Sequence, residues 1–283
     1  MPPPTVNKPV NKPTVALVTG GGAGIGFAIV HSLLQVGHSV VVFDLDAEGA
    51  GTAVKALNES FPGKVLLHVG DATSSSDLRD AFDAAEREFG AVEILVNNAG
   101  FGTIAPIVDL DEATWNAVIG VLVTGPFLAI QILARRAIAQ GAAASIINVS
   151  SVNFSVATEG LAHYCAGKAA VSMLTQVAAA ELGRHGIRVN AVAPGLIRTA
   201  LTEANHMTTG RFGKQFLERT PLGRLGEPED VARVVRLLVS DDAAWINGDT
   251  IYVDGGMHVK GLPSYWDTYQ ATLADIAESD VSL

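Results

Sequence analysis

The sequence predicts an α/β fold with seven parallel strands in one doubly wound sheet. Seven short runs rich in β-branched residues alternate with helix-length segments between residues 14 and 253. The runs are continuously apolar, which is typical of strands that are covered on both faces by helices. Because no linker or internal repeat interrupts this alternation, we expect a single domain over residues 14–256.

The individual elements follow in chain order from these local patterns. The segments between the apolar runs are long enough for helices, for example Ile25–Val36, Ser76–Phe89 and Ala162–Arg184. The predicted strands are Val15–Thr19, Ser39–Phe43, Val65–Val69, Ile94–Asn97, Ser145–Val149, Arg188–Val192 and Thr250–Val253.

Two segments fall outside the alternation. Residues 199–224 follow a Pro-Gly turn and have mixed polarity, so they form either a mobile lid over a substrate or an ordinary pair of surface helices. Residues 257–283 extend past the last predicted strand and carry Tyr265, Trp266 and Tyr269. This aromatic cluster docks on a neighbouring subunit, covers a pocket or packs on its own domain, and the sequence leaves these three alternatives open.

Composition excludes several classes of protein. Apolar residues make up 48% of the 283-residue chain and charged residues 17%, which argues against disorder. The net charge of −10 and the lack of a basic run argue against a nucleic-acid partner. The single cysteine, Cys165, cannot form an intrachain disulfide, which favours a cytoplasmic protein. The seven histidines show no metal-ligand spacing, so we expect no metal site.

Two further segments bear on targeting and membranes. Residues 1–13 hold five prolines and a tandem VNKP repeat without the apolar core of a signal peptide, so we expect a flexible tail. Residues 117–134 are almost free of charge, but their glycine, proline and glutamine residues are unfavourable in a bilayer. We therefore expect a helix buried on most sides, at a subunit contact, and no membrane partner.

A glycine-rich turn after the first predicted strand predicts a dinucleotide site. Residues 19–26 read TGGGAGIG, and a helix pattern begins at once. A strand, turn and helix in this order place free backbone N–H groups and the positive end of a helix dipole against a pyrophosphate, and glycine permits close approach. The residues predicted to make this contact are Gly20, Gly22, Ala23, Gly24, Ile25 and Gly26.

Asp44 indicates which dinucleotide binds. It closes the second strand 18 residues after Gly26, where a carboxylate can accept hydrogen bonds from the adenosine ribose hydroxyls. The same carboxylate would repel a 2′-phosphate, and neither Leu45 beside it nor Ala23 supplies a compensating positive charge. The sequence therefore predicts NAD in preference to NADP.

A tyrosine, a lysine and a serine form the predicted chemical centre. Tyr164 and Lys168 are at i and i+4 on one helix face, where the ammonium favours phenolate and brings the tyrosine pKa toward the working range. Ser151 follows the fifth strand, 13 residues before Tyr164, so its hydroxyl can hold a substrate oxygen beside the phenol. No nucleophile elbow or phosphate-binding GK[ST] motif competes with this interpretation.

Taken together, these motifs resemble the short-chain dehydrogenase/reductase family in its compact, single-domain Rossmann form. The resemblance covers residues 14–256. It is carried by the TGGGAGIG turn, Asp71 with Ala72, the NNAG run at 97–100, the INVSS run at 147–151, Tyr164 with Lys168, the PGLIRT run at 194–199 and the VDGG run at 253–256.

The resemblance implies a role for each residue of the chemical centre. Tyr164 is the general acid in ketone reduction and the base in alcohol oxidation. Lys168 binds the nicotinamide ribose and lowers the pKa of Tyr164, and Ser151 polarises the carbonyl and stabilises the developing oxyanion.

The resemblance also implies the remaining cofactor contacts. Asp71 and Ala72 flank the adenine, residues 98–100 line the cofactor channel, and Ile197 and Thr199 hold the carboxamide. Asn97, Asn148 and Asp254 are expected to serve the structure rather than the chemistry. Beyond the glycine turn, the predicted cofactor set is Asp44, Leu45, Asp71, Ala72, Asn98, Ala99, Gly100, Tyr164, Lys168, Pro194, Gly195, Ile197 and Thr199.

One position departs from the family pattern. Members usually carry an asparagine seven residues after the tryptophan that corresponds to Trp115, and this chain has Leu122 there. In the family that asparagine anchors a water that relays protons from the lysine, and leucine cannot form a hydrogen bond. Our hypothesis is that the proton relay is weakened or rerouted while hydride transfer is retained, with Asn153 as a local polar substitute.

The sequence thus predicts an NAD-dependent alcohol dehydrogenase or ketone reductase that acts on a small molecule. The predicted substrate contacts are Ser151, Asn153, Phe154 and Leu196, with residues 199–224, and this mostly apolar set favours a neutral hydrophobic or cyclic substrate. The alternatives are a polyol or sugar dehydrogenase, a 3-oxoacyl reductase and, because of Leu122, a cofactor-binding regulator without turnover. The resemblance implies a homotetramer or homodimer joined through two long helices.

Overall fold

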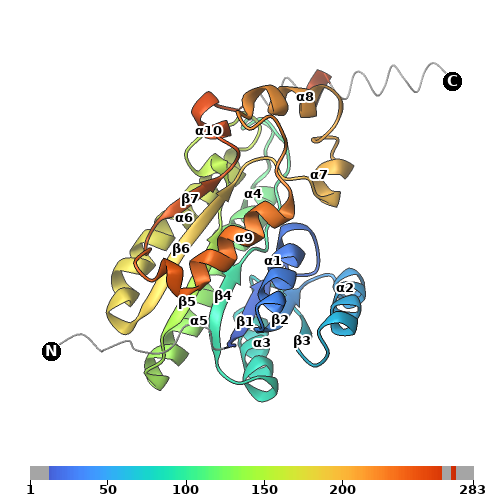
Figure 1. Cartoon of the computed structure of the whole chain (residues 1–283). Helices are drawn as coiled ribbons and strands as arrows, with labels where there is room; N and C mark the ends of the chain where they lie inside the picture. The colour runs from blue at the N-terminus through green and yellow to red at the C-terminus, as the bar shows by residue number, and fades with distance from the viewer. Residues whose placement is uncertain (1–12, 263–268, 272–283) are drawn as a thin grey trace.

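The computed structural model describes residues 13–262 and 269–271 (Figure 1). Within these residues, seven parallel strands form one sheet in the order β3-β2-β1-β4-β5-β6-β7, which confirms the predicted fold class. The strands are β1 (Val15–Thr19), β2 (Ser39–Asp44), β3 (Val65–Val69), β4 (Val92–Asn97), β5 (Ala144–Val149), β6 (Ile187–Pro194) and β7 (Thr250–Val253).

Helices cover both faces of the sheet, as continuously apolar strands require. Along β1, Ala16 and Val18 belong to the apolar core on one face, and Val15 and Leu17 belong to the core on the other. The first core is completed by α1 (Gly24–Gln35), α2 (Ala47–Ser60) and α9 (Pro228–Val239), and the second by α3 (Ser75–Glu88), α5 (Gly125–Gln140) and α6 (Ala162–Leu182).

The strand order decides where a ligand can bind. The chain moves outward from β1 to β3 on one side and returns to β4 on the other side of β1. The connections that follow β1 and β4 therefore leave the sheet in opposite directions, which opens a crevice at the carboxyl ends of these two strands. The glycine-rich turn after β1 and the NNAG run after β4 both lie at this crevice.

The helix before β5 contains an irregularity that the sequence did not predict. α4 (Glu112–Ile119) continues into a π-helical turn, Gly120–Thr124, and then into α5. The backbone N–H of Gly125 donates to the carbonyl oxygen of Gly120, and the next residue, Pro126, has no N–H to donate to Leu122. The proline thus accounts for the widened turn, and Leu122 lies inside it.

Residues 112–140 also form the one helix in the described part of the chain that is long and apolar enough to cross a membrane. Of its most apolar window, 44% is buried inside the domain, where α5 packs against β4, α3 and α6. Within the described chain this helix is therefore less buried than the predicted burial on most sides. Trp115 and Phe127 are exposed on this helix, as Met173 and Val177 are on α6.

Residues 199–224 form two short helices, α7 (Ala200–Ala204) and α8 (Gly210–Arg219), and α8 packs near α10 (Met257–Lys260) at one end of the molecule (Figure 1). Two phenylalanines of α8 form a third buried apolar cluster with residues from outside both helices, and Tyr269 packs against it. Tyr269 thus packs on its own domain, whereas Tyr265 and Trp266 lie outside the described residues. The cluster consists of Leu161, Leu196, Phe212, Phe216, Leu225 and Met257.

Candidate active site

The glycine turn is shaped by close contacts that leave no room for side chains. Gly20 has a φ of +62°, in the left-handed region that favours glycine. A Cβ atom at Gly26 would overlap the carbonyl oxygen of Gly20, because the first turn of α1 lies directly against the end of β1. The two glycines therefore allow the chain to reverse tightly from the strand into the helix.

Thr19 and Asn98 stabilise this turn through hydrogen bonds. The Asn98 side-chain amide donates to the carbonyl oxygens of Thr19 (3.2 Å) and Gly20 (2.8 Å). The buried Thr19 hydroxyl accepts from the backbone N–H groups of Asn98 (3.0 Å) and Ala99 (3.1 Å). The Asn98 side chain therefore supports the turn, and Thr19, to which sequence reasoning gave no role, joins β1 to β4.

The first turn of α1 fits a pyrophosphate. Its N-cap residue, Ala23, provides no side-chain hydrogen bond to the leading N–H groups of the helix. By contrast, Asp46, Ser74 and Asp111 cap α2, α3 and α4 through their side chains. An uncapped helix start at a glycine-rich turn is the arrangement that binds phosphate oxygens.

Asp44 lies beside the turn with a fixed carboxylate. One oxygen accepts from the Gly22 N–H (2.9 Å) and the other from the Asp46 N–H (3.1 Å). No lysine or arginine among the described residues forms an ion pair with Asp44, and Leu45 next to it is exposed. Among the described residues, no basic side chain therefore neutralises the negative charge at the end of β2.

Two loops complete the predicted cofactor cleft. After β3, the Asp71 carboxylate accepts from the backbone N–H and the hydroxyl of Thr73, both at 2.8 Å, which orders the turn that contains Ala72. After β6, Thr199 caps α7, and a Cβ atom at Gly24 would lie 3.3 Å from its methyl carbon. The turn after β1 and the chain after β6 thus lie in contact, and the loop after β3 lies at the same carboxyl edge of the sheet.

The residues expected to serve the structure do so. Asn97 donates to the Asn148 side chain (2.8 Å), which in turn donates to Thr175 (2.8 Å), and all three are buried. The Asp254 carboxylate accepts from the backbone N–H groups of Gly256 (2.9 Å) and His258 (2.7 Å). These contacts join β4 to β5 and α6, and fix the chain after β7.

Tyr164, Lys168 and Ser151 come together beside the carboxyl end of β5. Tyr164 and Lys168 lie one turn apart on α6, with the Lys168 Nζ atom 5.4 Å from the centre of the Tyr164 ring. Lys168 is 5% exposed, and its Nζ donates to the carbonyl oxygen of Val149 at the end of β5 (2.7 Å). Ser151 follows two residues later, within hydrogen-bonding reach of the Tyr164 hydroxyl.

The pKa of Tyr164 differs from the prediction. Burial raises the pKa of Tyr164 above its ordinary value, and the hydrogen bond with Ser151 opposes this shift without cancelling it. Burial also lowers the pKa of Lys168 to about 8. The pKa of Tyr164 is therefore raised overall, whereas the sequence predicted a value brought down toward the working range, because burial disfavours the phenolate. The neutral phenol is a proton donor near neutral pH.

Leu122 forms an apolar wall beside Lys168. It is 2% exposed, and its side chain fills the space that Cβ atoms would need at Gly100 (2.7 Å) and Gly167 (2.9 Å). A Cβ atom at Gly100 would also lie 3.8 Å from the Lys168 Nζ. The leucine is accommodated because both of its neighbours are glycines, so the position expected to hold a polar group is closed to water.

The predicted substrate residues have different surroundings. Asn153 is 5% exposed, and its hydrogen bonds are with Ser151, Val156, Thr158 and the Cys165 thiol rather than with Lys168. It therefore does not replace the missing asparagine as a partner of the lysine. Phe154 packs against the ring of Tyr252 on β7 (5.2 Å between ring centres). Leu196 belongs to the buried cluster beneath α8.

His163 has a structural contact that sequence reasoning did not assign. It is fully buried immediately before Tyr164, and its Nε2 atom is 3.0 Å from the Thr103 hydroxyl. A Cβ atom at Gly102 would lie 2.9 Å from the Tyr164 ring. The loop after β4 thus packs directly on the first turn of α6, and His163 and Gly102 set its distance from the phenol.

The base of segment 199–224 is closed by backbone pairing. Gly226 donates to the carbonyl oxygen of Leu196 (3.0 Å) and accepts from the N–H of Arg198 (2.8 Å). Ile197 and Gly226 therefore form an isolated parallel bridge between the chain entering the segment and the chain leaving it. The two ends of the segment are thereby held side by side.

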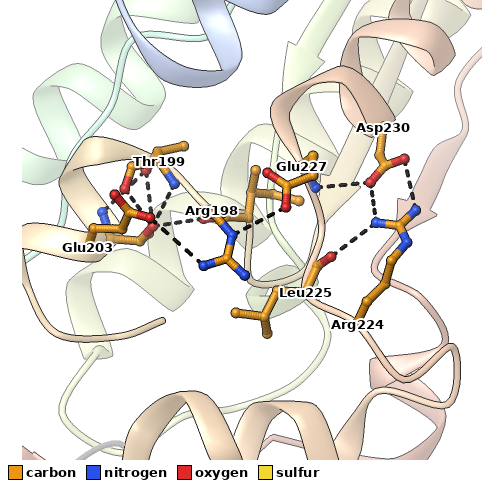
Figure 2. Close-up of polar contacts among 9 residues, drawn as sticks. Arg198, Thr199, Glu203, Arg224, Leu225, Glu227 and Asp230 are labelled. Carbon is orange, nitrogen blue, oxygen red and sulfur yellow. Dashed lines mark hydrogen bonds and ion pairs between the residues drawn. The ribbon is translucent and has the colours of Figure 1, made fainter. Parts of the chain in front are cut away.

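Two arginines add ion pairs at the same place (Figure 2). Arg198, at the start of the segment, lies 3.2 Å from the Glu227 carboxylate, and Arg224, at its end, binds both oxygens of Asp230 (2.6 and 3.0 Å). Glu227 and Asp230 belong to the first turn of α9 and its cap. Both ends of the segment are thus fastened to one helix start.

Known proteins are similar to this chain in sequence and in fold. Residues 20–258 match the family model described as enoyl-(acyl carrier protein) reductase. A 3-oxoacyl-[acyl-carrier-protein] reductase of Thermotoga maritima is 38% identical over 243 residues, which cover 86% of this chain and 97% of the relative. A diacetyl reductase of Staphylococcus aureus is 39% identical over 254 residues, or 87% of this chain and 98% of the relative.

A solved structure agrees with these matches. A gluconate 5-dehydrogenase from Burkholderia cenocepacia, in complex with NADP and tartrate, has a TM-score of 0.81 and 35% identity, and the match covers 87% of this chain and 95% of that chain. The chain belongs to the short-chain dehydrogenase/reductase family. It is therefore an oxidoreductase of a family that binds a nicotinamide cofactor.

Proposed function

We propose that this chain interconverts a secondary alcohol and a ketone by hydride transfer with NAD(H). The observation that carries the proposal is the meeting of Tyr164, Ser151 and Lys168 beside an uncapped helix start at a glycine-rich turn. A phenol, a hydroxyl and an ammonium at one cleft supply a proton, a hydrogen bond to a carbonyl oxygen and a cation.

Each residue has a distinct task in ketone reduction. The nicotinamide ring supplies the hydride to the carbonyl carbon when the cofactor is bound. Tyr164, which burial keeps neutral, donates its proton to the carbonyl oxygen, and Ser151 stabilises the charge that develops there. Lys168 uses one of its three donors on Val149, so two remain for ribose hydroxyls. In alcohol oxidation the proton and the hydride move in the opposite directions.

NAD is proposed over NADP because of the charge at the end of β2. Asp44 is fixed by Gly22 and Asp46 and has no basic partner among the described residues, so a 2′-phosphate there would meet an uncompensated carboxylate. The Burkholderia structure contains NADP, so cofactor choice within the family requires a direct measurement here. We expect Asp44→Ser to narrow the preference for NADH over NADPH at least tenfold, and an unchanged preference would contradict the assignment.

The substrate proposed is a neutral, hydrophobic or cyclic ketone or alcohol. The apolar cluster beneath α8 includes Leu196 and Leu161, and Tyr164 packs against it, so the phenol faces a largely apolar region. A sugar or polyol would need polar partners there. A 3-oxoacyl substrate on a carrier protein is the alternative suggested by the Thermotoga relative. The exposed apolar side chains on α5 and α6 support assembly into dimers or tetramers, which light scattering after size exclusion measures.

The decisive test is turnover followed at 340 nm with NADH or NAD⁺ and a panel of ketones and alcohols. We expect activity, and we expect Tyr164→Phe to lower kcat by about 100-fold or more while the affinity for NADH stays within threefold. Binding of NADH without turnover of any substrate, also after Leu122→Asn, would instead favour a cofactor-binding regulator. Full activity of Tyr164→Phe would contradict the proposed mechanism.

A further inference from the structure

We propose that Asn153 is a positioning residue that sets the direction of the Ser151 hydroxyl before the substrate binds. The inference rests on the proposed function, because it concerns the serine assigned to the substrate oxygen. It goes beyond the predicted role of Asn153 as a substrate contact, since the side chain is 5% exposed and its polar atoms are bonded to the protein.

Asn153 binds the hydroxyl of Ser151 twice. The Ser151 hydroxyl donates to the side-chain oxygen of Asn153 (3.2 Å), and the backbone N–H of Asn153 donates to the Ser151 oxygen (3.2 Å). A serine hydroxyl has one donor and two acceptor positions. These bonds use the donor and one acceptor position, so a single lone pair remains for Tyr164 or a substrate hydroxyl.

The orientation of the Asn153 amide is itself fixed. Its nitrogen lies 3.3 Å from the carbonyl oxygen of Val156 and 2.6 Å from the Thr158 hydroxyl. A carbonyl oxygen only accepts, so the amide nitrogen must face Val156 and the amide oxygen must face Ser151. Thr158 is also buried, so water does not compete strongly for these bonds.

These hydrogen bonds position the Ser151 hydroxyl for binding to the substrate oxygen. The two bonds fix the position of the Ser151 oxygen before the substrate arrives, and such preorganisation makes an oxyanion-stabilising group effective. The bond to the amide oxygen is long for an O–H donor, so the serine proton can turn to a ketone oxygen when one binds. Asn153 therefore acts on the reaction only through Ser151.

A double-mutant cycle tests this coupling. We expect Asn153→Ala to lower kcat by about tenfold, less than the loss of a direct oxyanion donor, with KM for NADH within twofold. In a Ser151→Ala background the same change should have no further effect, because the group that Asn153 positions is gone. Independent, multiplicative losses in the double variant would overturn the proposal.

Thr158→Val is the matched control. It removes one partner of the Asn153 amide and leaves both bonds to Ser151, so a role confined to ordering residues 155–160 predicts the same loss as Asn153→Ala. We expect kcat to fall less than twofold. A loss equal to that of Asn153→Ala would show that loop order, not serine orientation, matters.

A second readout needs no substrate. The titration of Tyr164 can be followed as the tyrosinate absorbance that Tyr164→Phe removes. The hydrogen bond from Ser151 lowers the pKa of Tyr164, so Asn153→Ala, which releases the serine from its position, should raise this pKa by about half a unit or more. No change in this pKa would overturn the proposal. Full turnover by both Ser151→Ala and Tyr164→Phe would overturn the proposed function as well, whereas normal kcat of Asn153→Ala alone would overturn only this inference.

Discussion

Two regions of the molecule are held in place by different forces. One is the rim, by which we mean the residues at the carboxyl ends of β1, β4 and β5 and the helix residues that pack on them. The other is the segment above it, residues 199–224. At the rim, buried polar groups such as Thr19 and Asn98 bind backbone atoms, and Gly26 has no space for a Cβ atom. The segment above is fastened by exposed ion pairs and rests on an apolar cluster. Rim positions therefore tolerate few residue types, whereas the segment tolerates many, and substrate choice can vary without disturbing the cofactor cleft.

The largest effect is expected at the glycine turn. Gly26→Ala places a methyl group against the carbonyl oxygen of Gly20, so the turn must shift away from the phosphate-binding position. We expect the affinity for NADH, measured by fluorescence titration, to fall by about 100-fold or more, or about 3 kcal/mol. Gly51→Ala is the control, because it is also helical and its Cβ atom has no neighbour closer than 3.9 Å. Equal effects of the two changes would show that the rim is no more restrictive than a surface helix.

Leu122 tests whether the rim can regain the polar group that the family usually has. Leu122→Asn should lower the free energy of unfolding by about 2–3 kcal/mol, because a buried leucine that fills the space beside Gly100 and Gly167 is lost. If an amide there restores a proton relay, the pH profile of kcat should shift by about half a unit or more. Leu122→Ala separates the effects, since it opens the same space without an amide. Indistinguishable profiles for the native chain and Leu122→Asn would contradict the relay hypothesis.

The buried ammonium of Lys168, at the rim, lowers the stability of the folded protein. Burial lowers the pKa of Lys168 from 10.5 to about 8, so keeping it charged in the folded state costs about 3 kcal/mol below pH 8. Replacing Lys168 removes this cost, but it also removes the hydrogen bond to Val149, which stabilises the folded protein by about 1 kcal/mol. We therefore expect Lys168→Met to be inactive but more stable by about 2 kcal/mol at pH 7 in urea denaturation.

The contribution of Lys168 to the free energy of unfolding should change with pH. The unfolded chain binds more protons at Lys168 than the folded chain between pH 8 and 10.5, so the native protein gains stability from this group as the pH rises through that range. The advantage of Lys168→Met should therefore shrink between pH 7 and pH 9.5. An advantage that grows with pH would mean that Lys168 is stabilised in its charged form.

Sequence reasoning succeeded at the rim because steric and hydrogen-bonding demands restrict the residue types there. The apolar runs predicted every strand of the described sheet, and the convergence of Tyr164, Lys168 and Ser151 followed from helix spacing and the end of a strand. The role of Thr19 and the direction of the Tyr164 pKa depend on burial and on distant partners, which no local pattern encodes. The π-helical turn is a similar case, because Pro126 marks the irregularity but not its form.

The smallest effect is expected at the base of the segment. Asp230→Asn weakens the two bonds to Arg224, so the end of the segment should detach more often from α9. We expect faster proteolytic cleavage within residues 199–224 and a two- to fivefold higher KM for the substrate, with the affinity for NADH unchanged. Asp83→Asn is the control, since it weakens a pair of equal length, with Arg136, far from the site. A loss of NADH affinity in Asp230→Asn would mean that the two regions are mechanically coupled, and that the ion pairs of the segment also hold the cofactor cleft in shape.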